Sequence, residues 1–190
     1  MEDEDLQNSH IDPSRRDMVT GGLDVDELPN GNGEFGRSAE NPIPVNGVTG
    51  ELIYLSRLMT KDTKQKLLFH RIGSLKAIDV YETVSIDGSN WDILFLSLYH
   101  PRKSRKTPAG YQIADSQSQP LIYGTNSRIG QFPFGLQKAI GHTTEQLLGI
   151  SLPPPEVREA EEKIVFQRPE DHERRVKIAF QNVAACLTGP

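Results

Sequence analysis

The chain has 190 residues, of which 36% are hydrophobic and 25% are charged, which is typical of one medium-sized globular domain. It lacks the roughly 18 consecutive apolar residues that a membrane-spanning helix needs, and its acidic start over 1–5 is unlike a secretory signal, so we expect a soluble, cytoplasmic protein. The single cysteine, Cys186, excludes an intrachain disulfide and a cysteine-rich metal site.

Residues 1–41 differ in charge from the rest of the chain. They carry 11 acidic side chains and three arginines, a net charge of −8, whereas the remaining residues have a net charge of +3. With Phe35 as its one aromatic residue, this segment has too little apolar surface to offset the entropy lost on ordering. We predict a disordered acidic tail over 1–41, either a solubilising leader or an arm that binds a basic surface. A single domain follows over 42–190, sheet-rich over 42–125 and helical over 135–190.

Two apolar runs, over 52–59 and 66–72, flank a polar stretch rich in lysine. Runs of this length, separated by a polar loop, predict two strands. A short helix over 51–59 is the alternative, because periodicity alone does not separate the two structures in so short a run.

The clearest local pattern is a β-hairpin over 77–99. Apolar residues alternate with polar ones on both sides of an Asp-Gly pair at 87–88, which is a favoured turn sequence. A two-residue loop at this pair places Val84 opposite Trp91 and so sets the register of the hairpin. The second strand is apolar on its other face as well, which indicates a central strand covered on both sides.

The second half of the chain carries helix signals after two short candidate strands, at 111–113 and 121–123. A capping-box spacing predicts a short helix from Thr143. Further helices are predicted over 155–167 and from Pro169 onward, the last with an apolar stripe at helical spacing. The expected fold is therefore α+β, with an antiparallel sheet around the central hairpin covered by C-terminal helices.

Two apolar runs end in the same residue types. The first supplies His70 and Arg71, and the second supplies His100 and Arg102. Histidine titrates near neutral pH and arginine binds phosphate or carboxylate, so an anion site would form if both ends lay at one edge of the sheet, with His70 and His100 within about 10 Å of each other. Alternatively, both pairs mark strand ends in contact with water. No metal site or cofactor is expected, because the H-x-x-x-H spacing is missing.

Glu82 stands on the otherwise apolar face of the hairpin. A carboxylate there either pairs with a basic partner or has its pKa raised by desolvation, as in many catalytic acids. It is the best catalytic candidate, with His70 and His100 as the other two. A salt bridge to Lys66 or Arg57 is the structural alternative, and no nucleophile motif accompanies the glutamate.

Basic side chains are densest at Arg102, Lys103, Arg105 and Lys106, and residues 56–106 hold ten basic and five acidic side chains. Such a patch could bind the phosphates of nucleic acid or dock the acidic tail, and a solvated loop is the default interpretation. Few aromatic rings lie nearby for base stacking, and the RRM, KH and zinc-finger patterns are absent, so nucleic-acid readout has little support.

The sequence as a whole offers isolated polar residues and no catalytic constellation. We therefore expect a non-catalytic binding or regulatory module that acts through protein–protein contacts. The alternative is a phosphate- or nucleic-acid-directed site, possibly hydrolytic, built from the histidine and arginine residues named above.

Overall fold

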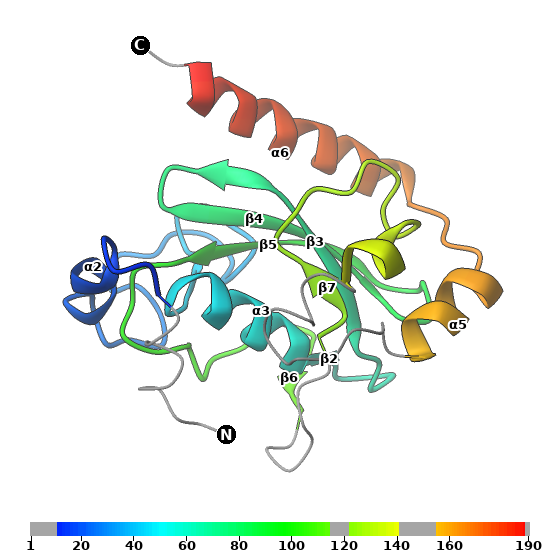
Figure 1. Cartoon of the computed structure of the whole chain (residues 1–190), viewed down its shortest axis with the longest axis horizontal. Helices are drawn as coiled ribbons and strands as arrows, with labels where there is room; N and C mark the ends of the chain where they lie inside the picture. Colours follow the sequence, from blue (N-terminus) through cyan, green and yellow to red (C-terminus); the bar gives the residue numbers. More distant parts are fainter. Residues whose placement is uncertain (1–10, 115–121, 141–154, 189–190) are drawn as a thin grey trace.

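A computed structural model of the chain describes residues 11–114, 122–140 and 155–188. At its centre is a mixed sheet of five strands in the order β1-β5-β4-β3-β7 (Figure 1). The three central strands are antiparallel, whereas the edge strands β1 and β7 run parallel to their neighbours β5 and β3. A second, two-stranded sheet pairs β2 with β6. The strands are β1 Ile43–Pro44, β2 Leu58–Thr60, β3 Leu67–Leu75, β4 Ile78–Ser85, β5 Trp91–Ser97, β6 Tyr111–Ile113 and β7 Gly124–Thr125.

Helices cover both faces of the five-stranded sheet, so the fold is α+β as predicted (Figure 1). The long helix α6 (Glu170–Thr188) packs on β3 and β5, and α3 (Gly47–Arg57) contacts β3 and β7 from the other side. Two shorter helices, α2 (Arg16–Thr20) and α5 (Pro155–Lys163), lie beside this layered core. In the described part of the chain, no helix combines the length and apolar character needed to cross a membrane.

Alternate residues of the central strand β4 contribute to different apolar layers. On the α3 side, Tyr81 is buried in one large cluster. On the α6 side, Val84 and Val80 belong to two separate clusters. Since side chains alternate along a strand, Glu82 lies on the α6 face, between the two valines that anchor these clusters.

The predicted register of the hairpin is confirmed, because Val84 pairs with Trp91 and the pairing continues to the far end of both strands. The turn is longer than the two residues expected. The Gly88 N–H donates to the Ser85 carbonyl oxygen, and Gly88 has φ +78°. A positive φ carries little steric cost for glycine, which explains the glycine at this point of the turn.

The segment over 52–59, predicted as a strand, is mostly helical. Helix α3 ends at Arg57, and only then does the short strand β2 begin. Leu52 and Leu55 are both buried, and their spacing of three places them on one face of a helix. The helical alternative was therefore the better interpretation of this run.

Residues 11–41 differ from the predicted disordered tail. Val19 and Phe35 are buried, and Phe35 belongs to the apolar cluster on the α3 side. The Phe95 N–H of β5 donates to the Gly36 carbonyl oxygen, which ties this segment to the sheet. The prediction counted only apolar residues within the segment, whereas the surface that covers Phe35 comes from the rest of the chain. The assignment of 42–190 as a single domain stays a prediction.

The helix predicted from Pro169 onward is confirmed as α6. Helix α5 ends at Lys163, a little earlier than expected. Strand β6 has the bounds predicted for 111–113, whereas the strand predicted over 121–123 is replaced by β7, which begins at residue 124. The helix predicted from Thr143 lies outside the described residues.

Candidate functional site

Glu82 is the centre of a buried polar cluster on the α6 face of the sheet. Its side chain is 1% exposed. On β4 it pairs with His70 of β3 on one side and with Ile93 of β5 on the other. A carboxylate is costly to bury unless opposite charges and hydrogen bonds surround it. The structure supplies both.

Four hydrogen bonds converge on the Glu82 carboxylate. His70 donates from Nε2 to Oε2 at 3.0 Å, and His172 donates from Nε2 to Oε1 at 3.1 Å. Arg168 contributes two bonds, from Nε to Oε1 at 2.8 Å and from Nη2 to Oε2 at 3.0 Å. We call these four residues the Glu82 cluster. It joins β3 and β4 to the start of α6.

The environment of Glu82 keeps it ionised. Desolvation by itself would raise the pKa of this carboxyl, but the hydrogen bonds from His172 and His70 and the charge of Arg168 outweigh it and hold the pKa at about 2. Of the two outcomes the sequence left open, pairing with a basic partner is the one observed. The partner is Arg168 rather than Lys66 or Arg57. A carboxylate with so low a pKa carries no proton to donate near neutral pH.

The hydrogen bonds of His70 define its tautomer. Its Nδ1 accepts the backbone N–H of Ile129 at 3.0 Å, so the ring proton resides on Nε2, which faces Glu82. Burial lowers the pKa of His70 despite the adjacent carboxylate. The ring also stacks on Phe132, with 4.3 Å between ring centroids. Both nitrogens and one ring face of His70 are therefore occupied by the protein itself.

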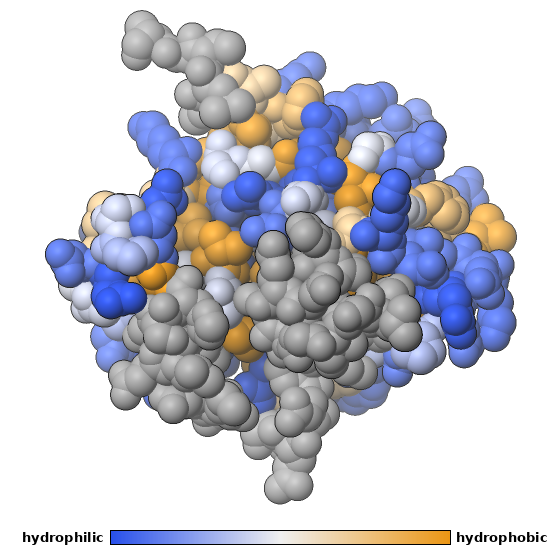
Figure 2. Space-filling model, in the orientation of Figure 1, coloured by the Kyte–Doolittle hydropathy of each residue, from blue (hydrophilic) through white to orange (hydrophobic). Residues whose placement is uncertain are grey.

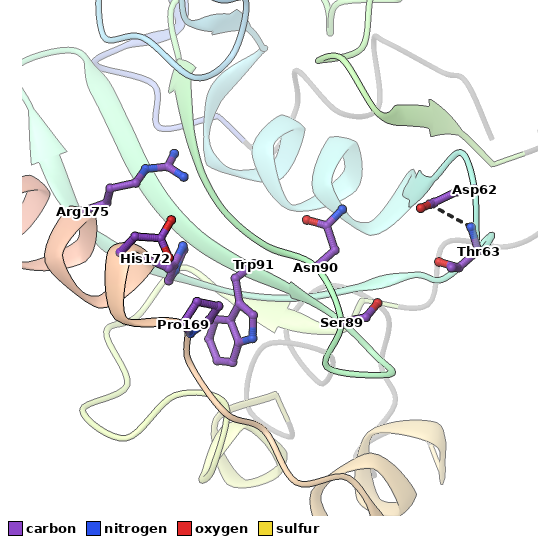
Figure 3. Close-up of a pocket in the computed structure, with 9 residues that line it drawn as sticks. Asp62, Thr63, Ser89, Asn90, Trp91, Pro169, His172 and Arg175 are labelled. Carbon is purple, nitrogen blue, oxygen red and sulfur yellow. Dashed lines mark hydrogen bonds between the residues drawn. The ribbon is translucent and has the colours of Figure 1, made fainter.

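His172 differs from His70 in having an unused nitrogen. Its Nε2 binds Glu82, whereas its Nδ1 is buried with no hydrogen-bond partner among the described residues. The residue is 2% exposed and lines a hollow of about 460 Å³ at the start of α6. Figure 3 shows Trp91 in this hollow, between the α6 residues and the side chains of Ser89 and Asn90. We call it the α6 hollow.

The remaining sequence-predicted residues lie elsewhere. His70 and Arg71 do not end a strand, since β3 continues to residue 75. His100 follows β5 and binds Ser97 through Nε2 and the Leu23 carbonyl oxygen through Nδ1, so it shares no hydrogen-bond partner with His70. The two histidines therefore belong to separate hydrogen-bonded groups.

Arg71 points to the α3 face, where it enters a second buried polar group. Its Nη1 donates to Asp79 at 2.9 Å, and the other oxygen of Asp79 accepts the Ser74 hydroxyl. Glu51 of α3 accepts the Tyr81 hydroxyl at 3.1 Å. Desolvation and the charge of Asp79 raise the pKa of Glu51 well above its ordinary value. This group joins α3 to the sheet, as the Glu82 cluster joins α6 to it.

The basic cluster that begins at Arg102 is paired with the acidic N-terminal segment. Arg102 contacts Asp24 and Asp26, each at 2.5 Å, and Lys106 pairs with Glu27. The hydrogen bond from Arg102 lowers the pKa of Asp26, with a further contribution from a backbone N–H. This second hydrogen bond comes from the Arg105 backbone N–H to the Asp26 carboxylate. Within the basic cluster itself, the Lys103 carbonyl oxygen accepts a hydrogen bond from Arg102. The alternative in which the acidic segment docks on the basic loop is thus the arrangement observed.

Apolar side chains are exposed in the link between α5 and α6 and in the turn over 131–135, which contacts this link. Val165 is 89% exposed and Phe134 is 46% exposed. The Phe134 ring meets the edge of Phe166 at 6.1 Å between centroids, and Phe166 itself is buried. We call Phe134, Val165 and Phe166 the apolar patch. Figure 2 shows apolar surface at the right-hand margin of the molecule, where this linking segment runs in Figure 1.

Two members of the Glu82 cluster were not identified from sequence. Arg168 and His172 lie 86 and 90 residues beyond Glu82, so no local spacing connects them with it. A weak signal was present, because both flank the predicted start of α6 and a lone glutamate on an apolar face requires a basic partner. Across the described ranges, no group of three or more His, Cys, Asp or Glu side chains is arranged to hold a metal ion.

Comparison with protein-family models, with curated proteins and with solved structures gives no significant match.

Proposed function

We propose that this protein is a non-catalytic binding module that acts by contacting another protein. The apolar patch carries the proposal. Val165 and Phe134 leave large apolar surfaces in water, and exposed apolar surface of this kind marks interaction sites. Phenylalanine is also among the aromatic residues that are enriched at protein interfaces.

The patch is held in place by the domain. Phe166 makes an edge contact with Phe134 and packs with the cluster around Val84 and Leu68. Ile164 lies against the β4–β5 turn, since a Cβ at Gly88 would stand 3.1 Å from it. The exposed side chains are thus presented by a packed segment. Such preorganisation reduces the entropy lost on binding.

The residues of the phosphate-directed alternative are largely engaged within the protein. Glu82 accepts four hydrogen bonds, and His70 and His100 each use both ring nitrogens. Arg102 and Lys106 are paired with carboxylates of the N-terminal segment. An incoming phosphate would have to displace these contacts. This favours the protein-binding proposal, and the phosphate- or nucleic-acid-directed site stays a prediction.

Site-specific photocrosslinking tests the proposal. A photoreactive amino acid replaces Val165 in the full chain expressed in its natural host, and a second version carries it at Lys177, an exposed position on α6. We expect a crosslinked partner from position 165 and not from position 177. Phe134→Asp, introduced with the crosslinker at 165, should remove that product, whereas Ile178→Asp, at an exposed apolar residue outside the patch, should leave it.

The crosslinked partner is then purified and its affinity measured for the same variants. A loss of at least tenfold with Phe134→Asp and no loss with Ile178→Asp is expected, because tenfold corresponds to about 1.4 kcal/mol, a modest value for an interface anchor. Equal crosslinking from positions 165 and 177, or binding that does not change with Phe134→Asp, would refute the proposal.

A further inference from the structure

The α6 hollow has the features of a small-molecule site. It lies between the start of α6, the end of the β4–β5 turn and the loop that joins β2 to β3 (Figure 3). Its volume of about 460 Å³ is within the range of ligand pockets in proteins, about 300–1,000 Å³. It does not overlap the apolar patch, so the inference is independent of the proposed function.

Two nitrogens of residues that line the hollow have no hydrogen-bond partner among the described residues. One is Nδ1 of His172, and the other is Nε1 of Trp91. Nε2 of His172 donates to Glu82, so Nδ1 is an acceptor in the neutral form of the ring, whereas the indole Nε1–H is a donor. A buried polar atom left unpaired costs about 1–3 kcal/mol, so both atoms favour a ligand that donates and accepts hydrogen bonds. A hydroxyl group does both.

The charges around the hollow favour a neutral ligand. Asp62 and Asp171 line it, together with Arg175. The Arg168 guanidinium lies behind this wall, 5.4 Å from the centre of the Trp91 ring. An anion would meet two carboxylates and a cation would meet two guanidinium groups, so neither is preferred. Carboxylates and guanidinium groups both form strong hydrogen bonds with hydroxyls.

We propose that the α6 hollow binds a neutral polyhydroxylated molecule of the size of a sugar. The Trp91 indole supplies an apolar edge for the carbon skeleton, and Asp62, Asn90 and Arg175 supply acceptors and donors around it. His172 Nδ1 accepts one hydroxyl proton at the inner end of the hollow. The bond from Nε2 to Glu82 fixes the orientation of the ring, and because Nδ1 has almost no accessible surface, the side chains around it must shift slightly for the hydroxyl to reach it.

The protein carries its own reporter for this site. Trp91 is the single tryptophan of the chain, so fluorescence excited selectively at tryptophan reports the hollow alone. The full chain is titrated with glucose, galactose, mannose, N-acetylglucosamine and maltose, and separately with inorganic phosphate and with ethylamine at constant ionic strength. We expect a saturable change with at least one sugar and none with phosphate or ethylamine.

Matched variants locate the binding. Arg175→Ala and Asn90→Ala each remove a polar group from the hollow, and each should weaken sugar binding about tenfold, the value of one hydrogen bond. Arg174→Ala is the control, because Arg174 is the exposed neighbour on α6 and does not line the hollow. Both substitutions are at the partly exposed margin of the hollow, but Arg175 also lies 3.5 Å from the buried Asp92 carboxylate, so thermal unfolding of each variant is measured to confirm that it is folded. The inference is overturned if no sugar gives a saturable change, if phosphate or ethylamine binds instead, or if Arg174→Ala weakens binding as much as Arg175→Ala.

Discussion

Arg168 and Glu82 form a two-point ion pair between the segment that leads into α6 and the central strand of the sheet. The guanidinium uses Nε and Nη2 against the two carboxylate oxygens, at 2.8 and 3.0 Å. Such paired geometry is specific to arginine. The same guanidinium also donates to the Phe132 carbonyl oxygen and lies over Trp91. One side chain therefore holds together three segments that are distant in sequence.

Replacing Arg168 by Met should destabilise the protein by about 3 kcal/mol. The substitution removes a cationic partner from a buried carboxylate. Breaking a buried ion pair in this way typically costs about 3–5 kcal/mol of stability, and the 27% exposure of the Arg168 side chain favours the lower end of that range. Denaturant unfolding followed by Trp91 fluorescence measures the change. Arg174→Met, at an exposed position, should stay within about 0.5 kcal/mol of the wild type. A loss below about 1 kcal/mol for Arg168→Met would show that Glu82 does not depend on this partner.

The stability of the fold should fall in acid because of Glu82. Its pKa is about 2 in the folded protein and 4.5 ordinarily, so the unfolded chain binds the proton first as the pH decreases. The stabilisation is present above pH 4.5 and is lost as the pH falls toward 2, with a total of about 3 kcal/mol. Glu82→Gln should remove this part of the slope. The free energy of unfolding of both proteins, measured from pH 2 to 6, gives the comparison, and parallel curves would contradict it.

Much of the fold could be predicted from local pattern, and the hairpin shows why. Alternation of apolar residues on both sides of a turn sequence determines which face of the sheet each side chain occupies, so a slip of one residue would move every side chain of the strand to the opposite face. The pairing of Val84 with Trp91 follows directly. The strands β1 and β7 are each two residues long, which is too short for any pattern, and this is why the parallel edges of the sheet were missed.

The candidate site was predictable only in part. Glu82 stood out because a charged residue interrupts an apolar face, and His70 was noted as part of a residue pattern. His70 was grouped with His100 on the premise that each lies at the end of a strand. This premise is wrong for His70, since β3 continues to residue 75. Arg168 and His172, which bind Glu82, belong to the start of α6 and the segment just before it, and their position depends on how that helix crosses the sheet. This is tertiary information that no local spacing contains.

The packing of α6 on β3 should depend on Gly73. A Cβ built on this glycine would stand 2.4 Å from Cγ1 of Val183, closer than side chains pack. Gly73→Ala should therefore destabilise the fold by about 1–3 kcal/mol. Gly130→Ala is the control, because a Cβ there meets nothing within 4 Å. In the double variant with Val183→Ala the clash is absent, and the combined loss should be smaller than the sum of the single losses by about 1 kcal/mol. Additive losses would show that the two residues do not contact.

The acidic residues over 24–27 dock on the basic cluster over 102–106, and this docking should depend on Arg102. Asp24 and Asp26 pair with this one guanidinium, which is largely covered by the contact. Arg102→Ala should speed amide hydrogen exchange over residues 23–28 while exchange in β4 stays unchanged. Because the two carboxylates are themselves solvent-exposed, the global free energy of unfolding should fall by no more than about 1 kcal/mol.

Salt provides an independent check on the same contact. Ion pairs between exposed groups are screened at high ionic strength, with a Debye length of about 3 Å at 1 M salt, so exchange over 23–28 should also accelerate in 1 M NaCl. Lys61→Ala is the matched control, since this lysine lies in the other lysine-rich loop and should leave exchange in the segment unchanged. If neither Arg102→Ala nor salt changes exchange over 23–28, the segment is held by its buried side chains, such as Val19 and Phe35, and its charges are incidental to its docking.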